Sequence, residues 1–317
     1  MNLRNKHRRY FKVAGITVCV ESDLDFDTIQ FNDELMTFAV DGPDDDNVTL
    51  RHHFEMPDLT GKDLGGELYH KPPWAISRKN GTWFYRGILP YGDVRELHRF
   101  AIFSADHSHG TIYSPALDRE MIIANGWQSL SLFPTDQIWL DPLLADRNAV
   151  MLHSAAAIVN GKGMIFIGHS DAGKSTTMEM LKEASRVGQG KNRLQNEQRL
   201  YVEILCDDRN IIRKWKDGWH IHGTWSHGTT ADVSSSCAPL QAILFLEQAK
   251  GNKIVPLTDR KLIWRGLLAT LIRSMVTAEW WEKELNVLEQ LVCEASFYTM
   301  HFDKTGAIVP ALGRLTR

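Results

Sequence analysis

The fold is indicated most strongly by the stretch Gly168-His169-Ser170-Asp171-Ala172-Gly173-Lys174-Ser175-Thr176. It fits the pattern G-x-x-x-x-G-K-[ST], in which glycine-rich backbone N–H groups surround a phosphate, the lysine reaches the phosphoryl oxygens and the serine hydroxyl faces Mg²⁺. We therefore expect a nucleotide with magnesium to bind here. The residues predicted to hold it are Gly168, Ser170, Asp171, Ala172, Gly173, Lys174, Ser175 and Thr176.

The residues on either side of this loop provide the context that the motif requires. Residues 164–167 (MIFI) predict a short buried strand, and residues 175–182 predict a helix that begins at the loop. A phosphate in the loop would then lie at a helix N-terminus, where unpaired N–H groups and the helix dipole favour an anion. A strand, a phosphate loop and a helix in this order are typical of an α/β nucleotide-binding fold.

Composition restricts the class of protein. A chain of 317 residues accommodates two domains of roughly 150 residues each. The net charge of −3 gives no reason to expect a nucleic acid or a membrane as a partner. There is no signal-peptide core and no apolar run long enough to span a bilayer, so we expect a cytoplasmic protein. The four cysteines form no C-x-x-C pair, which argues against a disulfide framework or a zinc knuckle.

The distribution of strand and helix patterns predicts a boundary near residue 140. Residues 1–140 read as a mainly β domain with an accessory or acceptor-binding role, and residues 141–317 as the nucleotide domain. Asn80-Gly81 and Asn160-Gly161 each predict a hairpin turn. The remaining predicted elements are strands within 11–21, 35–40, 48–54, 149–159, 200–206 and 242–246, helices within 120–144, 260–276 and 280–293, and a polar surface excursion at 184–199.

A phosphate loop needs an acidic partner, because Mg²⁺ prefers oxygen ligands and an attacking hydroxyl needs a base. Asp207-Asp208 follows an apolar strand, and two carboxylates there can divide these tasks, one holding Mg²⁺ through water and one accepting a proton. From its position alone His153 is equally well a core residue or a group that orients the acid. His107-x-His109 and His220-x-His222 have the spacing of metal ligands on a strand, but no acid or cysteine completes either set.

Taken in order, these motifs resemble the HPr kinase/phosphorylase-like family, and more closely its peptide-modifying serine kinases of the lasso-peptide type. The resemblance covers about residues 140–310 and rests on the motifs LHSAA (152–156), the phosphate loop, Asp207-Asp208, HGTW (222–225) and FLEQ (245–248). It implies a nucleotide core of the HPr kinase/phosphoenolpyruvate carboxykinase type with a mixed sheet. It further implies that His153 and Asp208 form an acid–base pair, that Ser175 and Asp207 lie on the metal side, and that Lys174 clamps the phosphate.

The family's E-[IV]-R-G-x-G signature is absent from this chain, so the resemblance does not predict HPr as the acceptor or phosphorolysis by pyrophosphate. The function expected is an ATP- and Mg²⁺-dependent kinase acting on a serine hydroxyl of a peptide or small protein, with Asp208 as base and an arginine such as Arg265 or Arg273 stabilising the phosphoryl group. Two alternatives stay open: a small-molecule kinase and a nucleotide-binding regulatory module without turnover. The sequence also leaves open whether the chain forms a homo-oligomer.

Overall fold

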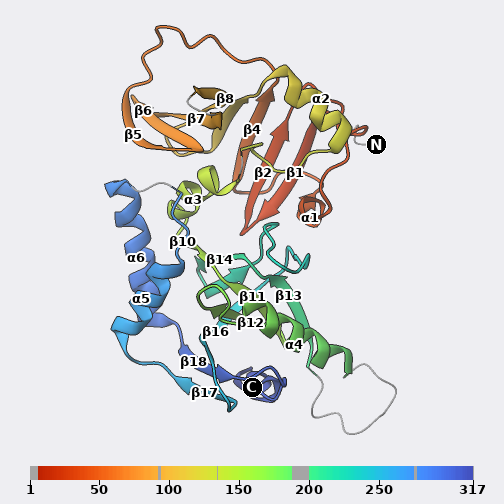
Figure 1. Ribbon diagram of the computed structural model, residues 1–317, viewed down its shortest axis with the longest axis vertical. Helices are drawn as coiled ribbons and strands as arrows, with labels where there is room; N and C mark the ends of the chain where they lie inside the picture. The colour runs from red at the N-terminus through yellow and green to blue at the C-terminus, as the bar shows by residue number, and fades with distance from the viewer. Residues whose placement is uncertain (1–5, 92–93, 134, 188–199, 275–276, 317) are drawn as a thin grey trace. The chain divides into compact units, whose positions relative to one another are not determined.

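The computed structural model describes residues 6–91, 94–133, 135–187, 200–274 and 277–316. It is a mixed α/β protein with two large mixed β-sheets, which confirms the α/β class (Figure 1). By its contacts the chain divides into two compact units: unit 1 contains residues 1–146 and 273–281, and unit 2 contains residues 147–272 and 282–317. The sequence had suggested a boundary near residue 140 and had placed 273–281 with the second part.

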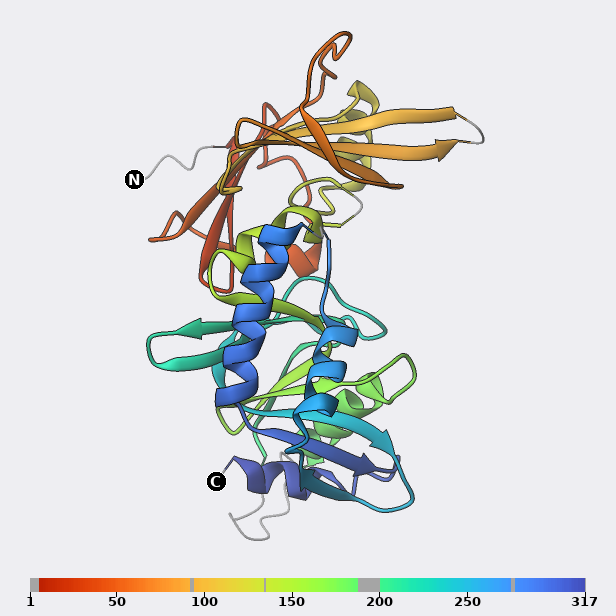
Figure 2. The same cartoon turned by 90° about the vertical axis from the view of Figure 1, so that its left-hand side faces the viewer.

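Unit 1 is built on a sheet of nine strands in the order β3-β1-β2-β4-β9-β8-β7-β6-β5. Its strands are β1 (Arg8–Val13), β2 (Ile16–Glu21), β3 (Ala39–Val40), β4 (Asn47–His53), β5 (Gly66–Lys71), β6 (Trp74–Lys79), β7 (Thr82–Tyr91), β8 (Val94–Phe103) and β9 (His109–Tyr113). Its helices are α1 (Asp33–Met36), α2 (Ala116–Asn125) and α3 (Gln137–Ala145). The strand direction turns across the sheet, which curls into a half-barrel (Figures 1 and 2). The β2–β4 and β4–β9 pairs are parallel, and the other described pairs of this sheet are antiparallel.

The segment 273–281 belongs to unit 1 because its polar groups are bonded there. The backbone N–H and the hydroxyl of Ser274 donate to the buried carboxylate of Asp141 on α3, at 3.2 and 2.8 Å. Glu279 forms an ion pair with Arg78 on β6 at 3.0 Å. A buried carboxylate is costly unless hydrogen bonds compensate for the lost water, so Asp141 fixes this return of the chain.

Unit 2 is built on a second nine-stranded sheet in the order β10-β14-β15-β16-β12-β11-β13, with β18 next to β16 and β17 next to β18. Its strands are β10 (Ala149–His153), β11 (Ala155–Val159), β12 (Lys162–Ile167), β13 (Val202–Cys206), β14 (Arg209–Trp215), β15 (Gly218–His222), β16 (Cys237–Gln248), β17 (Lys253–Pro256) and β18 (Phe297–Phe302). Its helices are α4 (Lys174–Val187), α5 (Arg260–Thr270), α6 (Ala278–Glu294), which starts in unit 1, and α7 (Val309–Leu315).

Helix α4 covers one side of the second sheet, and α5 with most of α6 lies on the other (Figures 1 and 2). Met178 and Leu181 lie on one face of α4 because residues three apart in a helix are neighbours, and both are fully buried. They pack with Phe166 of β12 and Phe302 of β18 in one apolar cluster. This cluster fixes the start of α4 against the end of β12, and therefore shapes the loop between them.

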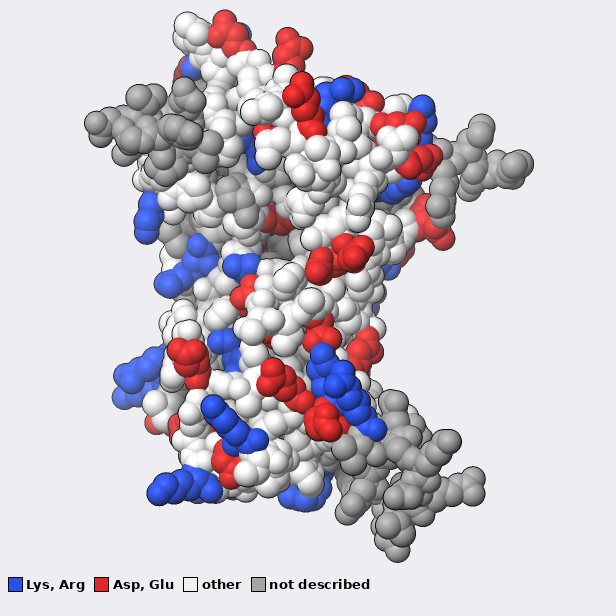
Figure 3. Space-filling model, turned by 45° about the vertical axis from the view of Figure 1, so that its right-hand side comes forward, with Lys and Arg blue, Asp and Glu red and all other residues white. Residues whose placement is uncertain are grey.

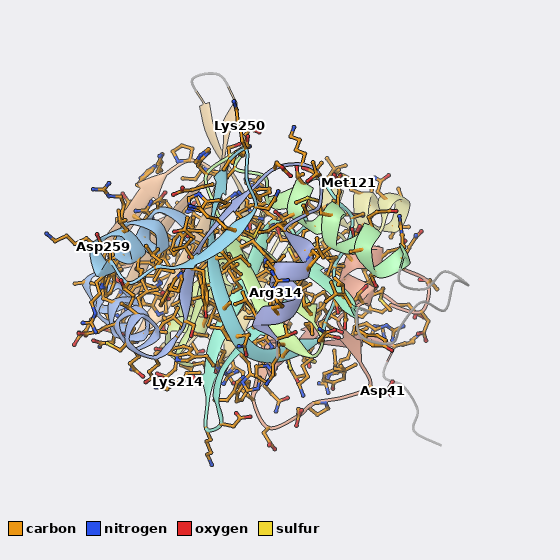
Figure 4. The ribbon with its side chains drawn as sticks, turned by 90° about the horizontal axis from the view of Figure 1, so that it is seen from below. Asp41, Met121, Lys214, Lys250, Asp259 and Arg314 are labelled. Carbon is orange, nitrogen blue, oxygen red and sulfur yellow. The ribbon has the colours of Figure 1, made fainter. Side chains whose placement is uncertain are left out.

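The opposite side of unit 2 is tied together by polar contacts of the β14–β15 hairpin. Lys214, which Figure 4 places on this hairpin, forms an ion pair with Glu294 of α6 at 2.5 Å. Trp219 of β15 donates its indole N–H to the same carboxylate at 2.8 Å. On α5, the side chain of Asp259 accepts hydrogen bonds from the backbone N–H groups of Lys261 and Leu262 and so caps the helix (Figure 4).

Both predicted Asn-Gly hairpins are confirmed. Asn80-Gly81 joins β6 to β7, and Asn160-Gly161 joins β11 to β12; all four residues have positive φ values, between 50° and 81°. A turn of this type matches the right-handed twist of the strands it connects.

Other elements differ from the sequence-based expectation. Residues 11–21 form a hairpin that turns at Ala14-Gly15, both with positive φ, and residues 35–40 contain the end of α1 before β3. Residues 149–159 break at Ser154 into β10 and β11, which pair with different strands. The first four residues of the predicted surface excursion at 184–199 form the end of α4, and residues 188–199 lie outside the described residues. Residues 275–276, at the end of the predicted helix 260–276, also lie outside the described residues.

Candidate functional site

The loop between β12 and α4 has a shape that requires glycine at two positions. At Gly168 a Cβ atom would approach the Cβ of Ala172 to 2.5 Å, and Gly173 has φ +102°, with the ring of Phe302 2.6 Å from where its Cβ would be. A side chain at either position would clash with its neighbour, so the loop or that neighbour would have to shift. The amide of Gln248 donates to the carbonyl of Asp171 at 2.7 Å and ties the loop to the end of β16.

Lys174, the first residue of α4, reaches back across this loop. Its Nζ donates to the carbonyl oxygens of Gly168 at 3.0 Å and His169 at 3.3 Å. The side chain is largely buried, and burial lowers the pKa of the ammonium below its usual value. The carboxylates of Asp208, Asp171 and Asp207 act in the opposite direction and favour the charged form. The positive charge is thus held over the loop with three acids around it.

The carboxylate of Asp207 is fully bonded at the end of β13. One oxygen accepts from the backbone N–H of Gly228 at 2.7 Å, and the other accepts from those of Thr229 and Thr230 at 3.1 and 3.0 Å. The hydroxyl of Ser175 donates to that second oxygen at 3.2 Å. Four donors fix the carboxylate, so it is well placed to orient the Ser175 hydroxyl and to contact a cation through water.

The carboxylate of Asp208 has different partners. His153 Nδ1 lies 3.0 Å from Oδ1, and Oδ2 is 2.9 Å from a guanidinium nitrogen of Arg209 and 3.0 Å from the Ser226 hydroxyl that donates to it. Burial acts to raise the pKa of this carboxyl, but the bond to His153, the charge of Arg209 and the Ser226 hydroxyl outweigh it. The net pKa is below the usual value. Asp208 is therefore an ionised acceptor at neutral pH.

The pairing of β10 with β14 explains why His153 and Asp208 meet. His153 is the last residue of β10 and stands opposite Arg209, the first residue of β14. The backbone N–H of Ser154 donates to the Asp208 carbonyl at 2.9 Å, and the buried amide of Asn210 donates to the Ser154 carbonyl at 2.8 Å. Two chain segments are thereby held edge to edge, with the histidine and the acid on them.

A buried thiol supports the turn at Asp207-Asp208. Cys206 Sγ accepts the backbone N–H groups of Asp208 and Arg209, each at 3.3 Å, and donates to the carbonyl of Ser226 at 2.6 Å. Burial raises the pKa of this thiol to about 11, so it stays protonated and acts as a structural group.

The structure thus brings together every residue that the sequence proposed for catalysis and for the metal side: Lys174, Ser175, Asp207, Asp208 and His153 all lie around the start of α4. Sequence reasoning missed two members of the site, Arg209 and Ser226. Arg209 contacts Asp208. That Arg265 or Arg273 stabilises a phosphoryl group stays a prediction. The only signal for Ser226 was its place beside Trp225 in a glycine-flanked loop.

The histidine pairs considered as metal ligands have other roles. His107 is buried, and its Nε2 lies 2.7 Å from the hydroxyl of Tyr85. His222 accepts a hydrogen bond from the indole of Trp215 at 3.3 Å, and burial lowers its pKa to about 3, so it is neutral. Within the described ranges no three His, Cys, Asp or Glu side chains are grouped as a metal site would need.

Unit 1 contains a pocket of about 360 Å³. It is lined by the Arg99–Asp118 ion pair and by apolar side chains that include Met121 and Phe133. Its lining contains none of the candidate site residues that the sequence predicted, and the site around α4 has the more specific chemistry.

On the face drawn in Figure 3, basic and acidic side chains of the described residues are interspersed, and neither positive nor negative charge forms a continuous patch there.

Comparison with known proteins gives no assignment: no protein-family model matches the chain, and no curated protein matches it. Among the helices that the structure describes, none is both long and apolar enough to cross a membrane.

Proposed function

We propose that this protein is an ATP- and Mg²⁺-dependent kinase that transfers the γ-phosphoryl group to a serine hydroxyl of a peptide or small protein. The observation that carries the proposal is the division of partners between two neighbouring carboxylates. Asp207 holds Ser175 of the loop at 3.2 Å, and Asp208 holds His153 at 3.0 Å. One acid is therefore suited to the metal side of the reaction and the other to the proton.

The nucleotide would bind along Gly168–Thr176, with its phosphates at the N-terminus of α4 and the Lys174 ammonium beside them. The donor set fits Mg²⁺: the Ser175 hydroxyl donates to Asp207, which leaves its oxygen lone pairs for a cation, while Asp207 would act through water. When bound, Mg²⁺ would neutralise charge on the β- and γ-phosphates.

In the transfer step, the serine oxygen of the acceptor forms a bond to the γ-phosphorus as the bond from phosphorus to the bridging oxygen breaks. ADP leaves with that electron pair, and the serine proton passes to the carboxylate of Asp208. His153 and Arg209 orient Asp208, and their hydrogen bond and charge keep it ionised. Lys174 offsets the negative charge that shifts toward ADP.

The proposal includes the kinship suggested by the sequence, in which unit 2 would be a nucleotide core like that of HPr kinase and unit 1 an accessory or acceptor-binding part in a cytoplasmic enzyme. It is supported by the order of the motifs and by the proximity of their residues around α4.

The test compares three variants with the unchanged chain. Asp208→Asn should lower transfer by about 10²- to 10⁴-fold, the usual effect of losing a general base, while ATP affinity stays within a few fold. Lys174→Met should weaken ATP binding itself. Asp217→Asn, at an exposed aspartate beyond β14, should change neither and serves as the matched control.

ATP affinity is measured by calorimetry, and transfer by mass spectrometry of serine peptides and of a metabolite pool. Transfer confined to metabolites would replace the proposal with a small-molecule kinase. Nucleotide binding without transfer to any acceptor would indicate a regulatory module, and full activity of Asp208→Asn would contradict the assigned base.

A further inference from the structure

Ser226, in the loop between β15 and β16, holds the position that an acceptor hydroxyl needs. Its Oγ donates to Asp208 Oδ2 at 3.0 Å. A hydroxyl that loses its proton to a base in the transition state must lie within hydrogen-bond reach of it, about 2.6–3.2 Å. If Asp208 is the base, as proposed above, Ser226 already meets this requirement.

Two other hydroxyl groups near the acid pair are engaged elsewhere, whereas the buried hydroxyl of Thr230, beside Asp207, has no hydrogen-bond partner. Ser175 donates to Asp207, on the metal side, and Thr224 donates to the carbonyl of Arg209 at 2.7 Å. Among the hydrogen bonds of the described residues, Ser226 provides the one hydroxyl that donates to Asp208. The two serines therefore have different partners: Ser175 bonds Asp207, on the proposed metal side, and Ser226 bonds Asp208, the proposed base.

Arg209 adds a second, independent feature. Its guanidinium group contacts the Oγ of Ser226 as well as Asp208, so a fixed positive charge lies directly beside this hydroxyl. A phosphoserine carries a charge of about −1.5 to −2 and binds arginine through strong charge-assisted hydrogen bonds. Arg209 would thus stabilise a phosphoryl group on Ser226.

The backbone around Ser226 is anchored, although the loop is accessible. The Ser226 carbonyl accepts from the Cys206 thiol at 2.6 Å, and its N–H donates to the hydroxyl of Thr224 at 3.3 Å. Ser226 itself is half-buried, and residues 227–229 beside it are exposed. Anchoring on both sides positions the hydroxyl before any ligand arrives, which is what an efficient intramolecular acceptor requires.

We infer that Ser226 is a phosphorylation site of the protein itself, modified in cis at the same centre. The Ser226 oxygen forms a bond to the γ-phosphorus of ATP, the bond from phosphorus to the bridging oxygen breaks, and ADP leaves with the electron pair. The hydroxyl proton passes to the Asp208 carboxylate. The inference rests on the proposed kinase function and identifies an acceptor for it within the chain.

The experiment incubates the full chain with Mg²⁺ and ATP labelled at the γ-phosphate, without any added acceptor, and maps the product by tandem mass spectrometry. The expected result is one phosphoryl group per chain, on Ser226, formed at a fractional rate that does not change when the protein is diluted. Ser226→Ala should lose the label and keep its affinity for ATP, and Ser226→Thr should recover part of it. Ser234→Ala is the matched control, because Ser234 lies in the same loop but bonds Glu203.

The outcomes separate this inference from the proposed function. Transfer to an added peptide with Ser226 unmodified would overturn the inference and leave the kinase in place. Label on a residue other than Ser226, or a rate that falls on dilution, would also overturn it. ATP binding with no transfer to the chain, to peptides or to metabolites would overturn both.

Discussion

The glycine before Lys174 gives a sharp test of how the loop between β12 and α4 is held. Gly173→Ala adds one methyl group at a residue with φ +102°, at a point 2.6 Å from the Phe302 ring. The left-handed backbone costs about 1–2 kcal/mol for a residue with a side chain. Crowding against a buried ring costs about 1–3 kcal/mol more. We therefore expect the free energy of unfolding of unit 2 to fall by about 2–5 kcal/mol.

Two further variants separate the two contributions. Gly161 also has a positive φ, +77°, but nothing lies within 4 Å of where its Cβ would be. Gly161→Ala should therefore show the backbone cost alone. Phe302→Leu shortens the side chain that the methyl group added by Gly173→Ala would meet. The loss in the free energy of unfolding of the double variant should therefore be about 1–3 kcal/mol smaller than the sum of the losses of the two single variants.

Stability would be measured by urea denaturation, with hydrogen exchange of α4 and β18 to locate the effect. Equal destabilisation by Gly173→Ala and Gly161→Ala would refute the contact with Phe302. Strict additivity with Phe302→Leu would lead to the same conclusion.

Two further predictions concern His222 and Ser175. Because burial lowers the pKa of His222 to about 3, the unfolded chain takes up a proton below about pH 6.5 that the folded chain does not. Stability should rise with pH between about 3 and 6.5, and acidification from pH 7 to 5 should cost about 2 kcal/mol through this group. Urea titrations should find this part of the slope missing in His222→Gln and unchanged in His227→Gln, at an exposed histidine. Ser175→Ala removes a hydrogen bond to a charged group, and we expect nucleotide affinity in the presence of Mg²⁺ to fall by about 10- to 100-fold. Calorimetry should detect no such loss for Ser185→Ala on the same helix, and an unaltered affinity of Ser175→Ala would contradict the assigned role.

The features that the sequence predicted well depend on neighbouring residues. Asn160-Gly161 sets its own turn geometry, and Gly168–Thr176 carries both the glycines and the helix start that shape the loop. Asp207-Asp208 could be placed because an apolar strand precedes it directly. In each case the residues that cause the local structure lie within about ten positions of one another, and sequence patterns for turns and helices extend over about this length.

The features that were missed depend on distant residues. The break at Ser154 arises because β10 pairs with β14 and β11 with β12 and β13, and no local pattern encodes those partners. Ser226 reads as an ordinary loop serine until β14 and β15 bring its loop to Asp208. The return of 273–281 to unit 1 depends on Asp141, a residue that looks like a solvent-exposed acid in the sequence.

The pairing of β10 with β14 has a consequence for how the candidate site forms during folding. His153 and Asp208 lie far apart along the chain. They meet only when β10 pairs with β14, and β11, β12 and α4 lie between these two strands in the sequence. Contacts of such long sequence separation pay their loop-closure entropy before they yield any stabilisation, and they favour slow folding. The turn at 168–176 depends on neighbouring residues, but the acid–histidine pair requires β10 and β14 to be paired. A fragment that ends before β14 would contain residues 168–176 and still lack the acid–histidine pair.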